Sequence, residues 1–74
     1  MNRTDKDYAE DLNKNGIRPS IQRIAIYKYI QEQPVHPTVD KVFTSLNKLY
    51  PTLSRTTVYN TLKTFAQCGL INSV

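Results

Sequence analysis

The sequence predicts a mainly α domain of the helix-turn-helix type, and three observations carry this prediction. Glycine and proline residues divide the chain into four segments that each suit a helix. In the third and fourth segments apolar residues recur at spacings of three and four, the period of an amphipathic helix. The connection between these two segments, "YPTLS" at residues 50–54, is short enough for a helix-turn-helix. A final segment, "LINSV" at residues 70–74, predicts the start of a β-strand.

Length and composition limit the chain to one small globular domain. Its 74 residues are 39% hydrophobic and 22% charged, which is unlike a disordered or membrane-embedded chain. No apolar run approaches the roughly 20 residues that cross a bilayer, and the N-terminus lacks the apolar segment of a signal peptide. The single cysteine, Cys68, has no partner for an internal disulfide. We therefore expect a cytoplasmic protein that makes no membrane contact.

The first two helices are predicted at about residues 5–14 and 20–33. The first is acidic early and basic late, as the helix dipole favours, and Gly16 can end it in a left-handed conformation. The second places a stripe of side chains on one face: Gln22, Ala25, Ile26, Tyr29 and Ile30. Three apolar side chains fall outside this stripe and need another neighbour or solvent: Ile21, Ile24 and Tyr27.

The third helix is predicted to begin after Thr38, which suits an N-cap, with Asp40 in its first turn. Its apolar residues form a clean stripe that should face the core: Val39, Val42, Phe43, Leu46, Leu49 and Tyr50. This helix is therefore expected to be a core element.

The fourth helix is predicted to begin after Ser54 as N-cap and to end at Gly69. Leu53, just before the cap, can pack against Val58 as a hydrophobic staple. The inner face is expected to carry Val58, Leu62, Phe65 and Ala66. The outer face is expected to carry Thr56, Asn60, Lys63, Thr64 and Gln67, flanked by Arg55, Thr57 and Tyr59. Cys68 follows the inner stripe and is expected to be a buried, structural thiol.

Charge is distributed unevenly along the chain. All six acidic residues lie within the first 40 residues, where they balance the lysines and arginines of that part. The remaining residues carry four basic side chains and no acid, so the whole net charge of +4 lies there. Such asymmetry favours a polyanionic partner. Because ordinary protein surfaces also reach this charge density, charge alone leaves both interpretations open.

The N-terminal part of the fourth helix has the chemistry of a DNA-reading element. In a helix-turn-helix this part of the second helix enters the major groove. Tyr59 offers a ring edge to a thymine methyl group, Asn60 can pair with adenine, and Lys63 follows one turn later. Phosphate oxygens can be held by the helix start and its polar side chains: Ser54, Arg55, Thr56 and Thr57. The absence of acidic residues removes repulsion from the duplex backbone.

Other functions remain open at this point. A short amphipathic helix normally has a solvated polar face, so the same residues also suit an ordinary surface. A module that docks another protein at the Tyr59 face is one alternative, and a binder of nucleic acid without sequence preference is another. An enzyme is not expected, because the single histidine and single cysteine lie some thirty residues apart without a nearby acidic partner downstream.

Two stretches resemble a known family. The run from His36 to Ile71 carries His-Pro-Thr, then a helix with apolar spacing, Pro51, and "SRTTVY" before a helix that ends in Gly-Leu. Upstream, "GIRPSIQR" at residues 16–23 is similar to the family's approach to its second helix, although Pro19 stands a residue or two earlier than the usual proline. By these motifs the chain resembles the DNA-binding domain of the ferric uptake regulator (Fur) family, especially its peroxide-sensing (PerR-like) branch.

The resemblance implies a winged helix-turn-helix and a sequence-specific DNA-binding function. Residues 1–15 would form an N-terminal helix, 16–71 the core and 70–74 the start of a wing strand, while the C-terminal dimerisation and metal domain would be absent. The partner would be double-stranded DNA with an A/T-rich palindromic operator. Arg18 would reach its backbone or minor groove, Tyr59 its thymines and Asn60 its bases. Arg23 and Lys63 would contact phosphates.

The resemblance also implies a metal response that this chain does not complete alone. His36 corresponds to a ligand that joins others from the C-terminal domain around Fe, Mn or Zn. Those other ligands are not in this sequence, so we expect no cofactor in this chain and little metal affinity. An intact protein would be a homodimer and a metal-responsive transcriptional repressor, whereas this chain would be a monomer or weak dimer.

Overall fold

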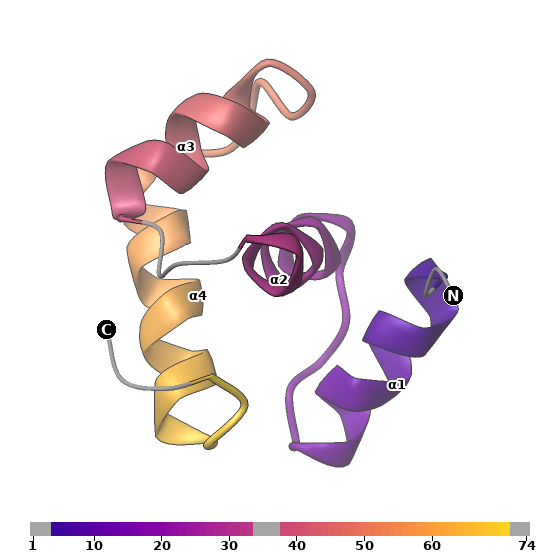
Figure 1. Ribbon diagram of the computed structural model, residues 1–74. Coiled ribbons are helices and arrows are strands. Elements are labelled where there is room, and N and C mark those ends of the chain that lie inside the picture. Colours follow the sequence, from indigo (N-terminus) through magenta and orange to yellow (C-terminus); the bar gives the residue numbers. More distant parts are fainter. Residues whose placement is uncertain (1–3, 34–37, 72–74) are drawn as a thin grey trace.

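Four α-helices make up the regular structure of the described residues, 4–33 and 38–71, in the computed structural model (Figure 1). Their bounds are Asp5–Lys14 (α1), Ile21–Glu32 (α2), Val39–Asn47 (α3) and Arg55–Gln67 (α4). Each helix lies on a segment where the sequence predicts one. The mainly α fold class is thereby confirmed, and no helix of the described residues is long and apolar enough to cross a membrane.

A hydroxyl side chain caps the start of each of these helices. Thr4 and Asp7 form a reciprocal capping box at α1. At the other three helices a side-chain oxygen accepts a hydrogen bond from the backbone N–H three residues on, and these caps are Ser20, Thr38 and Ser54. Beyond α1 and α4, Gly16 and Gly69 both have φ of 75°, the left-handed conformation in which glycine is favoured. The predicted caps at Thr38 and Ser54 are confirmed.

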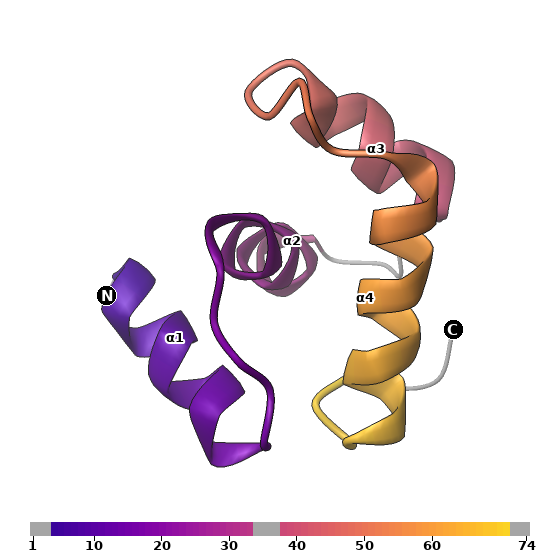
Figure 2. The same cartoon turned by 180° about the vertical axis from the view of Figure 1, so that it is seen from behind.

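Helix α2 lies in the middle of the fold, with α1 on one side and α4 on the other (Figures 1 and 2). Helix α3 lies across the N-terminal end of α4 and also packs against α2. Five side chains from all four helices are fully enclosed between them: Leu12, Ile26, Val42, Val58 and Phe65. Burial of these apolar groups is the main favourable contribution to the stability of such a small domain.

Tyr27 joins α1 to the rest of the core. It falls outside the predicted stripe of α2, yet only 4% of it is exposed. Its ring packs edge-on against Tyr8 of α1, with centroids 5.6 Å apart, and against Phe65 of α4 at 5.7 Å. Its hydroxyl donates to Oδ2 of Asp11 at 3.0 Å. The second neighbour that Tyr27 requires is therefore α1, and α1 is part of the core.

The predicted stripe of α3 is too long at its C-terminal end. The helix ends at Asn47, and Leu49 is 73% exposed instead of facing the core. Its backbone N–H donates to the carbonyl of Leu46, three residues earlier, so the chain tightens into a turn. Pro51 accounts for this, because a proline disfavours the helical conformation of the preceding Tyr50. Ile21, at the start of α2, is likewise 73% exposed.

Leu70 and Ile71 form a bend that packs against the core. The predicted wing strand at 70–74 otherwise falls on residues 72–74, which lie outside the described residues. It stays a prediction.

Candidate nucleic-acid interface

The turn between α3 and α4 is fixed by hydrogen bonds and by one buried side chain. The N–H of Tyr50 donates to the carbonyl of Leu46, and the N–H of Leu53 donates to the carbonyl of Tyr50, both at 2.9 Å. Leu53 itself is buried in the core. The side-chain amide of Gln22 donates to the Thr52 hydroxyl at 3.1 Å, which ties the turn to α2. This bracing sets the position of the N-terminal end of α4.

Two of the predicted phosphate-binding hydroxyls are engaged within the first turn of α4. The Ser54 hydroxyl accepts from the backbone N–H of Thr57 at 3.1 Å. It also shares a hydrogen bond of 2.9 Å with the Thr57 hydroxyl. Ser54 therefore acts first as a helix cap, while Thr56 between the two is exposed. A phosphate at this end would meet Thr56 more directly than Ser54 or Thr57.

The predicted base-reading side chains lie on the outer surface of α4. Tyr59 is 55% exposed, and Asn60 and Lys63 are also exposed. Opposite them, the inner face of the helix buries Val58 and Leu62. This arrangement meets the geometric requirement for contact with a duplex. The individual roles of Tyr59, Asn60 and Lys63 stay predictions.

Arg55 is held against α3. Its Nε donates to Oδ1 of Asp40 at 2.8 Å, and both side chains of this ion pair are well exposed. Its guanidinium carbon lies 4.5 Å from the centroid of the Phe43 ring, within range of a cation–π contact. The fourth helix contains no acid of its own, but Asp40 places one beside its first residue. The positive charge of Arg55 is therefore partly offset.

Arg23 and Arg18 are joined to each other. Nη1 of Arg23 donates to the backbone carbonyl of Arg18 at 2.8 Å, and the N–H of Arg23 donates to the Ser20 cap. Both arginines are exposed. A neutral carbonyl leaves the positive charge of Arg23 uncompensated, unlike that of Arg55.

A polar groove of about 430 Å³ separates Arg23 from α4. Its α2 side is formed by Ser20, Gln22 and Arg23. Its α4 side is formed by Thr57, Asn60, Thr61 and Thr64. We call this the α2–α4 groove. It brings Arg23, whose role rests on the family resemblance, next to Thr57 and Asn60, which were selected from the chemistry of the helix.

Thr61 of α4 was assigned to neither face of the predicted helix. Only 7% of this residue is exposed, and it is the one polar residue within the core of the described part of the chain. The signal was available, because Thr61 is three residues after Val58 and four before Phe65, a spacing that places it on the same inner face. Its hydroxyl caused it to be left out of the apolar stripe.

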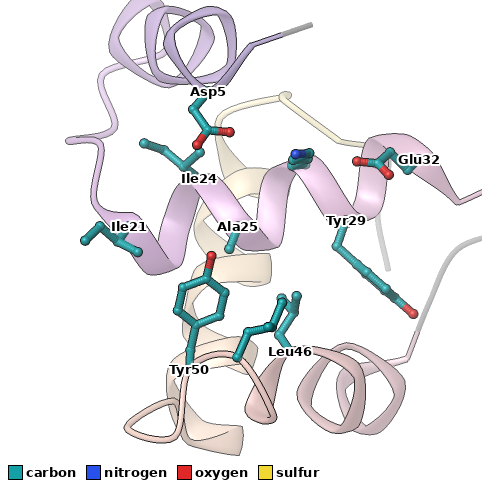
Figure 3. A pocket seen from close by; sticks show the side chains of 10 residues that line it. Asp5, Ile21, Ile24, Ala25, Tyr29, Glu32, Leu46 and Tyr50 are labelled. Carbon is teal, nitrogen blue, oxygen red and sulfur yellow. The ribbon is translucent and has the colours of Figure 1, made fainter. Parts of the chain in front are cut away.

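An apolar hollow of about 350 Å³ borders Tyr59. It is lined by Val39 of α3 and by five residues of α4: Tyr59, Leu62, Lys63, Ala66 and Gln67. A third groove of about 320 Å³ runs between α2 and α3, away from the outer face of α4 (Figure 3). The two strongly exposed aliphatic residues, Ile21 and Leu49, line this third groove.

His36 and Cys68 are the remaining two residues that the sequence singled out. His36, the candidate metal ligand, lies outside the described residues. Cys68 is exposed, so the expectation of a buried thiol is wrong. The reason is its position as the C-cap of α4, one residue beyond the last helical residue Gln67, where the inner stripe of the helix has ended. Within residues 4–33 and 38–71 no group of three metal-ligating side chains comes together.

A braced turn between two packed helices, with an outward-facing, acid-free second helix, defines a helix-turn-helix domain. Comparison with known families agrees with this class: the sequence profile described as "Ferric uptake regulator family" matches residues 14–74. The chain belongs to this family.

Curated relatives carry more specific names. The chain is 36% identical over 69 residues to the "Peroxide operon regulator" of Bacillus subtilis (strain 168), an alignment that covers 93% of this chain and 48% of the relative. It is 33% identical over 69 residues to the "Peroxide-responsive repressor PerR" of Staphylococcus saprophyticus, with 93% and 47% covered. The same name belongs to a relative in Staphylococcus epidermidis at 35% identity over 63 residues, with 85% and 42% covered. The chain spans about half the length of these relatives.

Proposed function

We propose that this chain is the sequence-specific DNA-binding domain of a metal-responsive transcriptional repressor. The observation that carries the proposal is that Tyr59 and Asn60 of α4 are both exposed. Family membership supports it, and the printed names of the relatives describe a regulator and repressors that respond to peroxide. The proposed partner is an A/T-rich palindromic DNA duplex.

Each side chain has a distinct task in this proposal. Tyr59 contacts thymine and Asn60 pairs with a base edge, so these two supply sequence preference. Lys63, Arg23 and Thr56 hold backbone phosphates and supply affinity without preference. Arg18 reaches the flanking backbone or minor groove. Phosphates near the start of α4 are contacted by Ser54, Thr57 and Arg55. Arg55 does so after it gives up part of its contact with Asp40.

The metal response depends on groups beyond the described residues. Fe, Mn or Zn would need several nitrogen, oxygen or sulfur ligands, and residues 4–33 and 38–71 hold no such group. His36 would supply one ligand in an intact cytoplasmic homodimer, with the others from a C-terminal domain. On this proposal the present chain binds DNA independently of metal, as a monomer or weak dimer.

Docking of another protein is the second candidate function, and the apolar hollow beside Tyr59 favours it. Its lining of Val39, Leu62 and Ala66 would suit an apolar side chain of a partner. This function and DNA binding would use the same face of α4. A measurement of duplex binding distinguishes them, because a docking module is not expected to bind DNA.

Fluorescence anisotropy tests the proposal with two labelled duplexes, an A/T-rich inverted repeat and a scrambled duplex of the same composition, over a series of salt concentrations. Tighter binding of the inverted repeat is expected. Equal affinities with a steep salt dependence would support a binder without sequence preference. No binding of either duplex at low salt would contradict DNA binding and support protein docking.

A further inference from the structure

The hydroxyl of Thr61 occupies an unusual position for a core residue. Thr61 is 93% buried, given its 7% exposure, and it lines the α2–α4 groove. Its hydroxyl makes no hydrogen bond with any of the residues 4–33 and 38–71. No side-chain oxygen or nitrogen in this part of the chain is both enclosed and unpaired. The Thr61 hydroxyl therefore opens into the groove, where it can bond to a ligand.

The groove around this hydroxyl suits an anion. None of the described residues that line it is acidic, and Arg23 stands at its α2 side. The bond from Arg23 to the Arg18 carbonyl uses one of five guanidinium N–H donors, which orients the side chain and leaves donors for a ligand. The groove also lies at the N-terminal turn of α2, where the helix dipole favours negative charge.

Each of the other hydroxyls of the groove has a hydrogen-bond partner. The Ser20 hydroxyl accepts from the backbone N–H of Arg23 at 3.2 Å. The Thr64 hydroxyl donates to the backbone carbonyl of Asn60 at 2.9 Å. The Thr57 hydroxyl is paired with Ser54. Thr61 and Arg23 are thus the donors best placed to bind an incoming acceptor, one neutral and the other charged.

We propose that the α2–α4 groove seats a phosphodiester of the duplex backbone, with the buried Thr61 hydroxyl and the Arg23 guanidinium as donors. This rests on the proposed DNA-binding function. Asn60 lines the same groove and faces bases in that function, so a sugar-phosphate ridge beside the major groove would pass over Thr61 and Arg23. A contact in a recess between two helices fixes the depth and register of α4 more closely than a contact with a mobile surface lysine.

The test replaces one hydroxyl at a time in the 74-residue chain. Thr61→Val is nearly isosteric and removes only the hydroxyl. We expect it to weaken binding of the A/T-rich inverted repeat and of the scrambled duplex alike, by about five-fold, the value of one net hydrogen bond. Thr61→Ser keeps the hydroxyl and should bind like the unmodified chain. Thr64→Val is the matched control, because its hydroxyl is satisfied internally, and its effect should be clearly smaller.

The salt dependence separates the two donors. Arg23→Gln should reduce the slope of log affinity against log salt by about one, because one phosphate charge is no longer neutralised. Thr61→Val should leave the slope unchanged, because the hydroxyl is neutral. Thermal melting, followed by circular dichroism, checks that each variant is folded at the temperature of the binding measurement.

Inorganic phosphate provides a readout that needs no duplex. In NMR titrations, phosphate should shift the backbone amide signals of Gln22, Arg23 and Thr61, and chloride at equal ionic strength should not. Thr61→Val should diminish these shifts.

Two results would overturn the inference. The first result is that the unmodified chain prefers the inverted repeat, while a folded Thr61→Val variant loses no more duplex affinity than Thr64→Val. In that case the groove holds no phosphate, although the proposed DNA-binding function stands. If the unmodified chain binds neither duplex, the proposed function fails and the duplex phosphate with it, even where inorganic phosphate shifts the signals.

Discussion

At the residue scale, Arg55 shows how a neighbouring helix changes the availability of a charge. Its Nε bonds to Asp40 at 2.8 Å and its guanidinium stacks on Phe43 at 4.5 Å. An exposed ion pair of this kind is worth only about 0–1 kcal/mol, so a phosphate can compete for the arginine. Asp40 nevertheless remains close by and repels the phosphate. Arg55 should therefore contribute less to DNA affinity than Arg23.

The first prediction concerns Asp40→Asn. It removes the competing charge and should strengthen binding of both duplexes by roughly 0.5–1 kcal/mol, the size of an exposed pair. The salt dependence should become steeper, because Arg55 then acts as a full charge. Anisotropy titrations at several salt concentrations measure both effects.

Two controls isolate the pair. Glu10→Gln removes an exposed acid from α1, outside the candidate interface, and should have a smaller effect. In the background of Arg55→Ala, Asp40→Asn should lose most of its effect, as a double-mutant cycle requires. If Asp40→Asn strengthened duplex binding equally in that background, Asp40 would act only through the overall charge of the protein and not through Arg55.

Single residues were predictable where local sequence decides their environment. The Ser54 cap and the outward position of Tyr59 follow from cap chemistry and helical period alone. The partner of Arg55 was not predictable from local sequence. Asp40 lies 15 residues away and contacts Arg55 only because α3 and α4 cross. Thr61 was assigned to neither face because of its hydroxyl, and Cys68 was wrongly expected to be buried because it follows the inner stripe and free cysteine is often buried.

At the element scale, α1 belongs to the same core as the helix-turn-helix. Leu12 of α1 is fully buried, and Tyr8 packs edge-on against Tyr27. The family profile begins at residue 14, at the end of α1, so this packing is a feature of the structure that the profile does not cover. Helix α1 is therefore expected to stabilise the element that carries Arg23.

The second prediction compares two aliphatic truncations. Leu12→Ala should lower the free energy of unfolding by about 2–5 kcal/mol, because it leaves a cavity between α1 and α2. Ile21→Ala, at a side chain that is 73% exposed, should change it by less than about 0.5 kcal/mol. Urea denaturation followed by circular dichroism measures both. Similar losses for the two variants would mean that α1 does not pack as described.

Helix positions were largely predictable from the sequence, and their tertiary partners were not. Glycines and prolines divide the chain into the four segments that form the helices, and the caps at Thr38 and Ser54 mark where two of them begin. The end of α3 was placed too late because the apolar period continues through Leu49, while Pro51 stops the helix earlier. Helical period also showed that Tyr27 needs either another neighbour or solvent, and only the packing of α1 on α2 decides between them.

At the scale of the whole molecule, the candidate interface extends over three helices. Helix α4 presents Tyr59 and Asn60, α2 places Arg23 on one flank, and Asp40 of α3 restrains Arg55 on the other. The sequence predicted α4 as the centre of this surface and assigned net positive charge to the C-terminal half. It did not predict the α2–α4 groove, which exists only because the two helices pack side by side.

The third prediction concerns metal ions. Because the described residues bring together no set of three ligating side chains, zinc or manganese ions should leave the melting temperature and the duplex affinity of this chain unchanged. A ligand that binds only the folded state raises the melting temperature, so differential scanning calorimetry with and without metal is a direct check. A clear rise would reveal a site that involves residues such as His36.

Tyr59 on the outer face of α4 is proposed to read bases, and the ratio of affinities for the two duplexes measures this role. Tyr59→Ala should weaken binding of the A/T-rich inverted repeat by about 1–3 kcal/mol and of the scrambled duplex by much less. Lys63→Ala should weaken both about equally, because it removes a phosphate contact. Equal losses on the two duplexes for Tyr59→Ala would show that Tyr59 does not read bases.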